Sequence, residues 1–242
     1  MALIKCPECG NVVSDMATAC PKCGYPIEIE LHNSPAEKKY YVAAKQGDAD
    51  AQFNLALCYY KGEGIKADKA AAVKWYRKAA EQEHSKAQFN LAFCYEYGEG
   101  VERNLTYAVE WYRRAAEQGD ANAQFKLASC YDNGKGIEED KAAAVKWYRK
   151  AAEQEHSGAQ YDLAVCYEHG EGVEEDKIEA VKWYRRAAEQ GLKEAQYNLA
   201  LCYDKGEDVR DKVEAIKWYQ RAAEQGLKEA QLRLRIIEYT LR

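Results

Sequence analysis

The chain has 242 residues, 47% hydrophobic and 31% charged, and 35 Lys and Arg against 40 Asp and Glu give a formal net charge of −5. This balance supports one or two packed domains and argues against binding to nucleic acid or anionic lipid through a broad basic field. No run of about eighteen apolar residues occurs, and the opening MALIKCPECG lacks the apolar core of a signal peptide. We therefore expect a soluble, cytoplasmic protein without a membrane partner.

The N-terminal segment contains two CxxC motifs, CPECG with Cys6 and Cys9 and CPKCG with Cys20 and Cys23. Four thiolates suit tetrahedral Zn²⁺, and a closed shell of sulfur ligands leaves no position for a catalytic water, so one structural zinc ion is expected. Two disulfides or a redox-active CxxC pair are the alternatives. The segment resembles the zinc-ribbon family over residues 1–31, which implies a small β-hairpin fold that depends on its metal.

The charge of this segment bears on its partners. Residues 1–30 contain two Lys and four Asp or Glu residues, a net charge of −2. Phosphate binding is disfavoured on such a surface. We expect a structural or protein-docking ribbon, with a nucleic-acid-associated factor as the alternative.

From residue 35 onwards the chain is predicted to be helical and repetitive. The tetrapeptide SPAE at 34–37 is typical of a capping box with Pro at the first helical position. A linker and an N-terminal capping helix fill residues 32–50, and a C-terminal capping helix fills 230–242, so that twelve helices are expected in all. The five repeats between them, the last one residue shorter in its loop, are 51–86, 87–122, 123–158, 159–194 and 195–229.

Each repeat contains two amphipathic helices, helix A and helix B, separated by a loop with glycines. In the first repeat, Leu55 and Cys58 mark the apolar face of helix A, and Trp75 and Tyr76 mark that of helix B. Asp68 stands where helix B needs an N-cap. A helical hairpin cannot bury both faces alone, so the repeats should stack into a solenoid with the tryptophans between neighbours.

The repeat pattern is A-x-x-x-L-[small]-x-x-Y, then G-x-G, then A-x-x-W-Y-x-x-A-A. It is similar to the Sel1-like subclass of tetratricopeptide repeats over residues 35–242. The resemblance implies an all-α, right-handed α-solenoid that gathers protein partners, with helix A lining its concave surface. Two features depart from the family pattern. Ala56 or Cys58 and their equivalents replace a usual Gly, and Glu83 and Glu155 replace the Gly after helix B. These glutamates would strain their turns by up to about 1 kcal/mol each if φ is positive.

The remaining cysteines recur every 36 residues, at Cys58, Cys94, Cys130, Cys166 and Cys202. Single cysteines on a regular lattice are typical of small packing residues and not of half-cystines. This placement agrees with a reducing compartment.

The outward stripe of helix A is the predicted partner surface. Repeats 51–86 and 123–158 differ at 8 of 36 positions; four of these lie on this stripe, whereas helix B is unchanged. Selection on helix A would explain the contrast, and drift after a recent duplication is the alternative. The stripe carries one aromatic residue per repeat, which could anchor a peptide or protein or pack on the next helix A. The predicted partner-binding residues are Phe53, Leu57, Tyr60, Lys61, Phe89, Phe93, Tyr97, Phe125, Tyr161, Val165, His169, Tyr197 and Leu201.

No sequence motif of catalysis was found. SxxK, GxSxG, HExxH and phosphate-binding glycine loops are absent, and the four His lack metal-ligand spacing. Some cysteine-rich relatives of this repeat class have been proposed as penicillin-binding enzymes, but they pair two cysteines per repeat and this chain has one. We predict a non-catalytic adaptor, with a nucleic-acid-associated factor or a hydrolase as alternatives. A monomer is expected, and a homodimer through the apolar C-terminal helix is the alternative.

Overall fold

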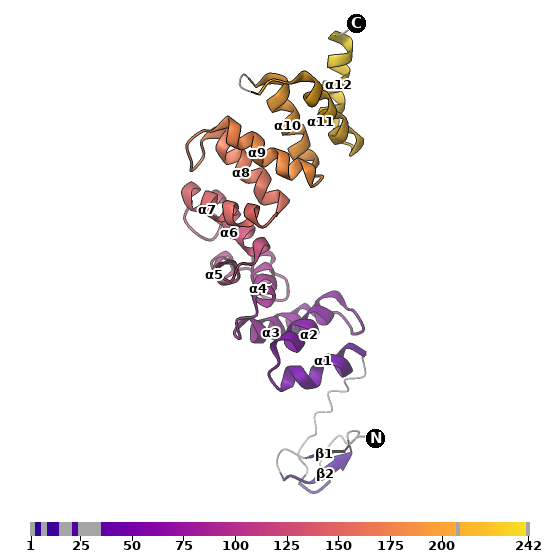
Figure 1. Cartoon of the computed structure of the whole chain (residues 1–242). Helices are drawn as coiled ribbons and strands as arrows, with labels where there is room; N and C mark the ends of the chain where they lie inside the picture. The colour runs from indigo at the N-terminus through magenta and orange to yellow at the C-terminus, as the bar shows by residue number, and fades with distance from the viewer. Residues whose placement is uncertain (1–2, 6–8, 15–20, 24–34, 207–208, 241–242) are drawn as a thin grey trace.

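In the computed structural model, a small two-stranded sheet precedes a long array of helices (Figure 1). The structure describes residues 3–5, 9–14, 21–23, 35–206 and 209–240. Cys6, Cys20 and the expected capping residue Ser34 lie outside the described residues. Strand β1 (Leu3–Lys5) pairs antiparallel with β2 (Val12–Ser14), with Ile4 opposite Val13, as in the predicted β-hairpin.

The described residues contain twelve helices, which confirms the predicted all-α solenoid that follows the ribbon. The helices are α1 (Pro35–Lys45), α2 (Ala49–Lys61), α3 (Lys69–Ala80), α4 (Ser85–Tyr97), α5 (Leu105–Glu117), α6 (Ala121–Asn133), α7 (Lys141–Glu153), α8 (Ser157–His169), α9 (Lys177–Glu189), α10 (Lys193–Lys205), α11 (Lys212–Glu224) and α12 (Lys228–Thr240).

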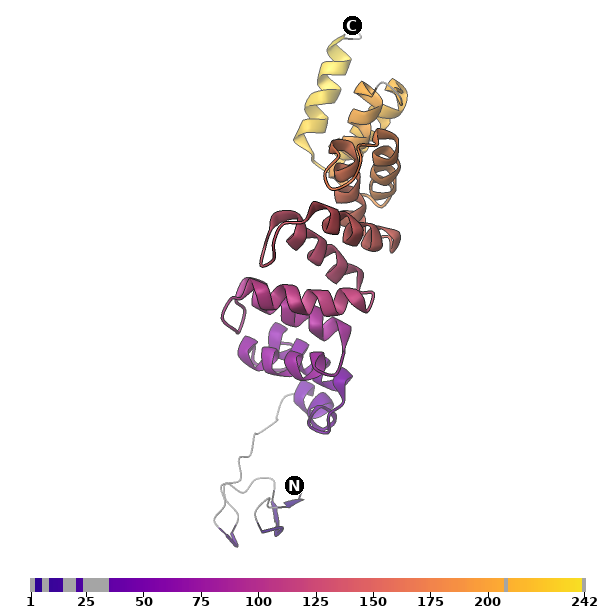
Figure 2. The same cartoon turned by 90° about the vertical axis from the view of Figure 1, so that its left-hand side faces the viewer.

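The helices form consecutive hairpins. Helices α2, α4, α6, α8 and α10 are the A helices, and α3, α5, α7, α9 and α11 are their B partners. Each helix packs chiefly on the helix before it and the helix after it in sequence. Both views show the array running from α1 at one end to α12 at the other (Figures 1 and 2). Such a chain of neighbour contacts is the defining property of a solenoid.

The ends of the helices follow the turn chemistry of the sequence. The Asp68 carboxylate accepts a hydrogen bond from the backbone N–H of Ala71 at 2.9 Å and caps α3. Gly62 ends α2 in the left-handed conformation, with φ of 77°. The N-cap predicted at Asp68 is confirmed, and its equivalents cap the other B helices at Asn104, Asp140, Asp176 and Asp211.

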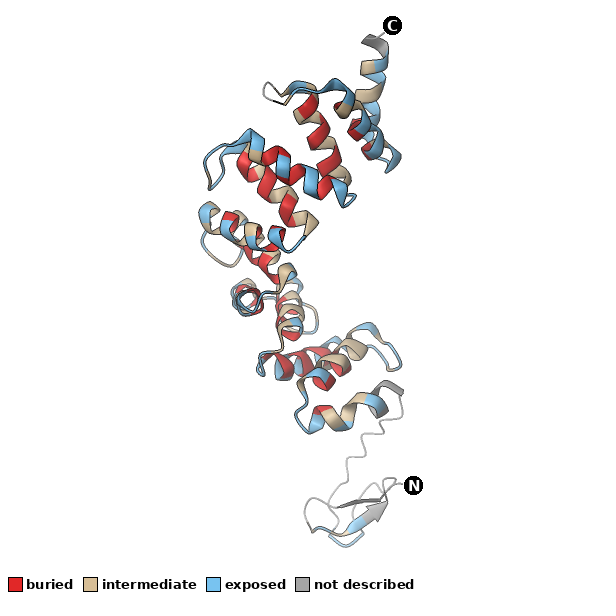
Figure 3. Ribbon diagram, in the orientation of Figure 1, coloured by how far each residue is buried: buried red, intermediate tan, exposed pale blue. Residues whose placement is uncertain are grey.

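The core consists of two clusters of buried side chains, one over α1 to α6 and one over α6 to α12. Figure 3 shows the buried positions along these helices. Leu55 of helix A and Tyr76 of helix B are almost completely buried, and so are their equivalents in the other repeats. Alanines such as Ala79 and Ala80 are fully buried and let the helix backbones approach closely. Trp75 is buried as predicted, and the Lys78 ammonium lies 4.3 Å from its ring centroid.

The second glycine of the A-to-B loop touches the preceding repeat. A Cβ atom on Gly100 would lie 2.2 Å from the carbonyl oxygen of Lys69, in the first turn of α3, and φ at Gly100 is 71°. The same approach recurs at Gly136 and Gly172, at 2.4 and 2.2 Å from the nearest carbonyl oxygen. This position therefore needs Gly both for its backbone conformation and for the contact between repeats.

Buried glutamines link each repeat to the one before it. In the second repeat, Gln88 Nε2 donates to the carbonyl of Ala80 at 3.1 Å, and its Oε1 accepts from Gln118 Nε2 at 2.8 Å. All five repeats contain this pair of bonds, which we call the glutamine ladder. Because these amides are buried, their hydrogen bonds must be made within the protein.

The predicted strain after helix B is confirmed at Glu83 and Glu155, whose φ values are 61° and 62°. Both carboxylates join the glutamine ladder. Glu155 Oε2 accepts from Gln160 Nε2 at 3.0 Å and from Gln190 Nε2 at 3.3 Å. These bonds offset part of a backbone cost of about 1 kcal/mol, which explains how a residue with a side chain is tolerated here.

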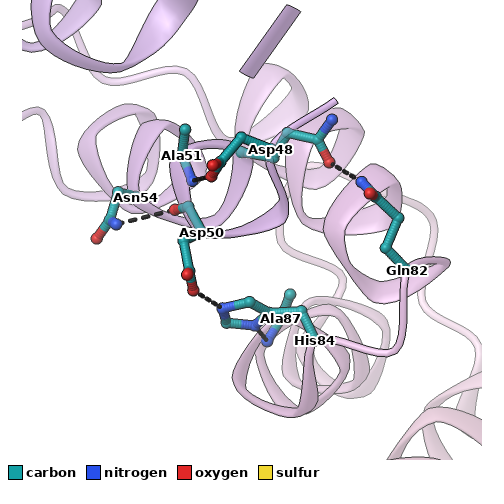
Figure 4. A network of polar contacts seen from close by, with 8 residues as sticks. Asp48, Asp50, Ala51, Asn54, Gln82, His84 and Ala87 are labelled. Atoms are coloured by element: carbon teal, nitrogen blue, oxygen red, sulfur yellow. Dashed lines mark hydrogen bonds and ion pairs between the residues drawn. The ribbon is translucent and has the colours of Figure 1, made fainter. Parts of the chain in front are cut away.

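A histidine follows each of these glutamates and caps the next A helix. His84 Nδ1 accepts from the N–H of Ala87 at 3.1 Å, and its Nε2 lies 3.1 Å from Asp50 Oδ1 (Figure 4). His156 caps α8 in the same way. Asp48, also drawn in Figure 4, has this role at α2. The array therefore uses both histidine and carboxylate caps at one structural position.

Candidate partner-binding surface

The aromatic residues of the outward stripe lie half-buried against helix B of their own repeat. The ring centroids of Phe53 and Tyr76 are 6.0 Å apart, and those of Phe89 and Tyr112 are 5.6 Å apart. The other pairs are Phe125 with Tyr148, Tyr161 with Tyr184 and Tyr197 with Tyr219. Packing within the repeat thus covers one side of each ring and leaves the rest of its surface partly open.

Two of these rings are covered further. His84 stacks on Phe53 with a centroid distance of 4.7 Å, and His156 stacks on Phe125 at 4.5 Å. The corresponding caps of the other repeats are not aromatic: Asp120 caps α6 and Leu192 precedes α10. Phe53 and Phe125 therefore each contact a second ring, that of the histidine cap.

A cavity of about 270 Å³ opens between α2 and α4. Its volume is below the roughly 300–1,000 Å³ of sites that enclose a whole small molecule, and suits one or two side chains of a partner. Five of the predicted partner-binding residues line it. The lining residues are Leu57, Tyr60, Lys61, Tyr76, Phe89, Asn90 and Phe93.

Sequence reasoning did not assign Tyr76 or Asn90 to this site. Tyr76 belongs to the core of helix B, and burial raises the pKa of its hydroxyl well above the usual range. Asn90 occupies a position that varies among the repeats, because Lys126 and Asp162 replace the Asn in the third and fourth repeats. That variation within one chain was the available signal for Asn90.

The edge of the cavity continues onto α4 and α6. Phe93 and Tyr97 have ring centroids 4.4 Å apart, and Tyr97 is 52% exposed. The Lys126 ammonium lies 3.2 Å from the Tyr97 hydroxyl and 3.3 Å from Glu96 Oε2. Tyr97 thus joins an apolar floor to a charged edge.

The remaining predicted residues lie on the later A helices, α8 and α10, and do not meet in one pocket. Tyr161 accepts a hydrogen bond from Asn198 Nδ2 at 3.2 Å, and Tyr197 follows it one repeat later. Val165 is half-buried and His169 is exposed. Leu201 borders a separate cavity of about 380 Å³ between α9 and α10.

The charge of the stripe changes along the array. Where the third repeat has Lys126, the fourth has Asp162, and burial together with the nearby Asp132 raises the pKa of Asp162 to about 6. A hydrogen bond from Tyr148 opposes part of this shift. Lys141 Nζ pairs with Asp132 at 2.9 Å. The stripe is therefore apolar at α2 and α4, carries Lys126 and the paired Asp132 at α6, and carries Asp162 at α8.

The unchanged outer side of helix B has a structural explanation. Arg77 donates to the hydroxyl of Tyr95 in the next repeat at 2.5 Å, and Arg113 donates to Tyr131 at 3.0 Å. Lys78 covers the ring of Trp75. Since these exposed basic residues stabilise the stacking of repeats, their constancy does not by itself point to selection on helix A.

The repeat cysteines behave as packing residues. They carry free thiols, and Cys94 is 1% exposed. Burial raises the pKa of Cys94 and Cys166 to about 12, which keeps both thiols protonated and poorly nucleophilic. The prediction that these positions are not half-cystines agrees with this arrangement.

The structure describes two of the four predicted zinc ligands. Cys9 and Cys23 belong to the described residues, whereas Cys6 and Cys20 do not. Across the described ranges, no group of three or more His, Cys, Asp or Glu side chains is arranged to hold a metal ion. Gly10, directly after Cys9, has φ of 70°, the turn geometry that a CxxCG metal loop needs. The donor set and this turn therefore fit a zinc ion.

Stacked helical hairpins that contact only their neighbours define an α-solenoid of the tetratricopeptide-like class. The family model described as Sel1 repeat matches residues 49–84, 85–120, 121–156, 157–192 and 193–227. The chain therefore belongs to the Sel1 repeat family. A model described as zinc-ribbon domain matches residues 2–27. Proteins with Sel1 repeats are generally protein-interaction scaffolds.

Two solved structures are similar to this chain. The Sel1 repeat protein from Oxalobacter formigenes is 37% identical with a TM-score of 0.72, over 79% of this chain and 85% of that one. The protein c5321, a protective antigen of uropathogenic Escherichia coli with an SLR fold, is 35% identical with a TM-score of 0.63. That match covers 90% of this chain and 54% of c5321, so this chain spans about half of its length.

No curated protein matches the chain significantly. Within the described ranges, no helix has the length and the apolar composition that crossing a membrane requires.

Proposed function

We propose that this protein is a cytoplasmic, non-catalytic scaffold that binds a protein or peptide partner on the A helices, which would form the concave surface. The cavity between α2 and α4 carries this proposal, because an apolar hollow on an otherwise polar surface suits an anchoring side chain. General protein-interaction roles in the family support it.

The proposed contact has an apolar floor and a polar edge. Phe89 and Phe93 would receive an aliphatic or aromatic side chain of the partner, while Lys61 and Asn90 would meet its backbone or polar groups. Burying one such side chain contributes about 1.5–3 kcal/mol. The cavity alone would therefore give weak binding, and further contacts along the array would add affinity.

The N-terminal ribbon completes the proposal as a cap of the array or a second docking module. Cys6, Cys9, Cys20 and Cys23 would hold one zinc ion, whose role would be to stabilise the fold of this segment. The net charge of −2 over residues 1–30 favours protein over nucleic acid as its partner. The proposed working state is a monomer.

The test replaces the cavity wall with a side chain that the repeat already tolerates. Ser129 occupies the position of Leu57 and Phe93 in the third repeat, so Leu57→Ser and Phe93→Ser should fold. Val165→Ser changes the same position of the fourth repeat, which does not line the cavity, and shows whether a loss of affinity is specific to the cavity. Affinity capture identifies partners of the wild type, and titration calorimetry then measures their Kd.

Partners that lose about tenfold or more in affinity with Leu57→Ser and Phe93→Ser together, and little with Val165→Ser, would support the cavity as the anchor site. Equal losses of affinity in the cavity double variant and in Val165→Ser, or no loss in either, would refute the cavity as the anchor site. Circular dichroism of each variant checks that the helices are intact.

A further inference from the structure

A second hollow lies between α1 and α3 and shares no lining residue with the cavity between α2 and α4. Its volume is about 890 Å³. Helix α1 contributes Tyr41 and Lys45, α3 contributes Trp75, and the loop after α4 contributes Gly100 and Val101. We call it the α1–α3 groove. It belongs to the B-helix side of the array, because α1 corresponds in sequence to the end of a B helix.

The inner wall of the α1–α3 groove is aromatic. Tyr41 and Trp75 meet edge to face, with ring centroids 6.1 Å apart. The Lys45 ammonium lies 5.2 Å from the Tyr41 centroid, and the Lys78 ammonium lies 4.3 Å from that of Trp75. Apolar ring surface and positive charge are therefore presented together.

No acidic side chain of the described residues forms an ion pair with the basic groups of the groove. The four basic groups are Lys45, Lys74, Arg77 and Lys78, and Glu81 is the one acidic residue among the described residues that line the groove. Arg77 donates to a neutral tyrosine hydroxyl, which leaves its charge uncompensated. The groove thus carries a net charge of +3 on a protein whose net charge is −5.

On α9 and α11, three basic residues at the positions of Lys74 and Lys78 form ion pairs. Lys182 lies 2.8 Å from Glu179, Lys217 lies 2.7 Å from Glu214, and Arg186 pairs with Glu155 at 3.2 Å. The contrast sets the N-terminal end of the array apart from its C-terminal end.

We propose that the α1–α3 groove is a second docking site, which receives an acidic peptide segment of a partner protein. Partner carboxylates face Lys45, Lys74 and Lys78, and an apolar side chain of the segment lies on Trp75 and Val101. Charge complementarity of this kind speeds association and fixes register. The site goes beyond the binding surface on the A helices and does not depend on it.

A peptide fits the groove better than a nucleic acid. Tracking a polynucleotide needs a row of phosphate contacts. The next B helix, α5, balances Arg113 and Arg114 with Glu110 and Glu117, so the positive surface ends after α3. The volume is within the roughly 300–1,000 Å³ of defined ligand sites, which corresponds to a short segment.

The chain offers a matched control for this site. Residues 69–80 in α3 and residues 141–152 in α7 have the identical sequence KAAAVKWYRKAA, but it is α3 whose Trp75 meets Tyr41 of α1. The double variant with Lys74→Glu and Lys78→Glu, called the α3 variant, reverses two of the positive charges of the groove. The double variant with Lys146→Glu and Lys150→Glu, called the α7 variant, makes the same charge change on the same helix sequence, away from the groove.

The probe is a fluorescein-labelled, Glu-rich peptide with one central Phe, followed by fluorescence anisotropy at low and physiological salt. The wild type and the α7 variant should bind it alike, and the α3 variant should bind about tenfold or more weakly. Added salt should weaken the binding. Lys45→Glu, on the exposed end of α1, should also weaken binding of the peptide. This variant tests the groove independently if the α3 variant does not fold.

Equal losses in the α3 and α7 variants would overturn the proposal, because general electrostatics would then explain the binding. It would also be overturned if the wild type fails to bind at low salt, or if a single-stranded oligonucleotide of equal charge binds more tightly than the peptide. The variant with Leu57→Ser and Phe93→Ser should bind the probe as the wild type does, which separates this site from the α2–α4 cavity.

Discussion

Replacing Gly100 by Ala should weaken the contact between the first two repeats. The new Cβ would lie 2.2 Å from the carbonyl oxygen of Lys69 and 2.8 Å from the nitrogen of Ala70. Both atoms are backbone in the first turn of α3, so no side-chain rotation can relieve the overlap. The loop must move away from α3, and the packing of the two repeats must loosen with it.

The expected loss has two parts. Holding an Ala residue at φ of 71° costs about 1–2 kcal/mol. Relieving an overlap of this kind in a packed interface costs about a further 1–3 kcal/mol. The free energy of unfolding should therefore fall by about 2–5 kcal/mol in Gly100→Ala.

Gly119→Ala separates the two parts. Gly119 also has a positive φ, 94°, but nothing lies within 4 Å of its Cβ position, so only the backbone cost applies. Urea unfolding followed by circular dichroism measures both variants, and hydrogen exchange of α3 and α5 locates the loss if the array unfolds in stages. Equal destabilisation by the two substitutions would refute the close contact as a determinant of stacking.

Three further predictions concern other elements. Glu155→Ala keeps the strained backbone and removes the carboxylate, so it should lower the free energy of unfolding by about 1 kcal/mol, whereas Glu155→Gly relieves the strain and should cost less; equal losses would contradict the offset. Burial lowers the pKa of His156, so the unfolded chain takes up its proton first and stability should fall as pH drops below about 6.5. His156→Asp, which copies the cap at Asp120, should flatten this dependence in pH-dependent urea unfolding; an unchanged slope would exclude His156 as its source. Chelation of zinc should make residues 1–31 sensitive to protease and leave the helical circular dichroism signal unchanged; a ribbon that resists both chelator and protease would contradict metal-dependent folding.

The repeat period made most of the fold predictable. Asp68 and its equivalents fixed where the B helices begin, and the recurrence of Trp75 fixed the face that meets the next repeat. The same periodicity exposed Glu83 and Glu155 as departures, and both adopt the strained conformation that their positions required.

The glutamine ladder was not predicted, because amphipathic patterns assign polar residues to the surface. Gln88 is nevertheless fully buried, since the carbonyl of Ala80 needs a partner where two repeats meet. Its signal was present in the sequence as a glutamine in the same place in every repeat. A polar residue that recurs at each period is better explained by a shared hydrogen bond than by solvent exposure.

The candidate site was harder to predict than the fold. The cavity between α2 and α4 depends on how Leu57 and Phe93 from successive repeats leave a space beside Phe89. The corresponding residue of the third repeat, Ser129, is small, and no sequence rule states whether a neighbour then fills the gap. Hollows of this kind result from differences between repeats, whereas the fold results from what the repeats share.

The two histidine caps divide the array into blocks. His84 precedes α4 and His156 precedes α8, while Asp48 and Asp120 precede α2 and α6, so like junctions are separated by two repeats. Excision of residues 85–156 would join His84 directly to Ser157 and recreate the junction that His156 already makes. The natural module for shortening or lengthening this protein is thus the pair of repeats between the two histidine caps, because editing there creates no junction that the original lacks.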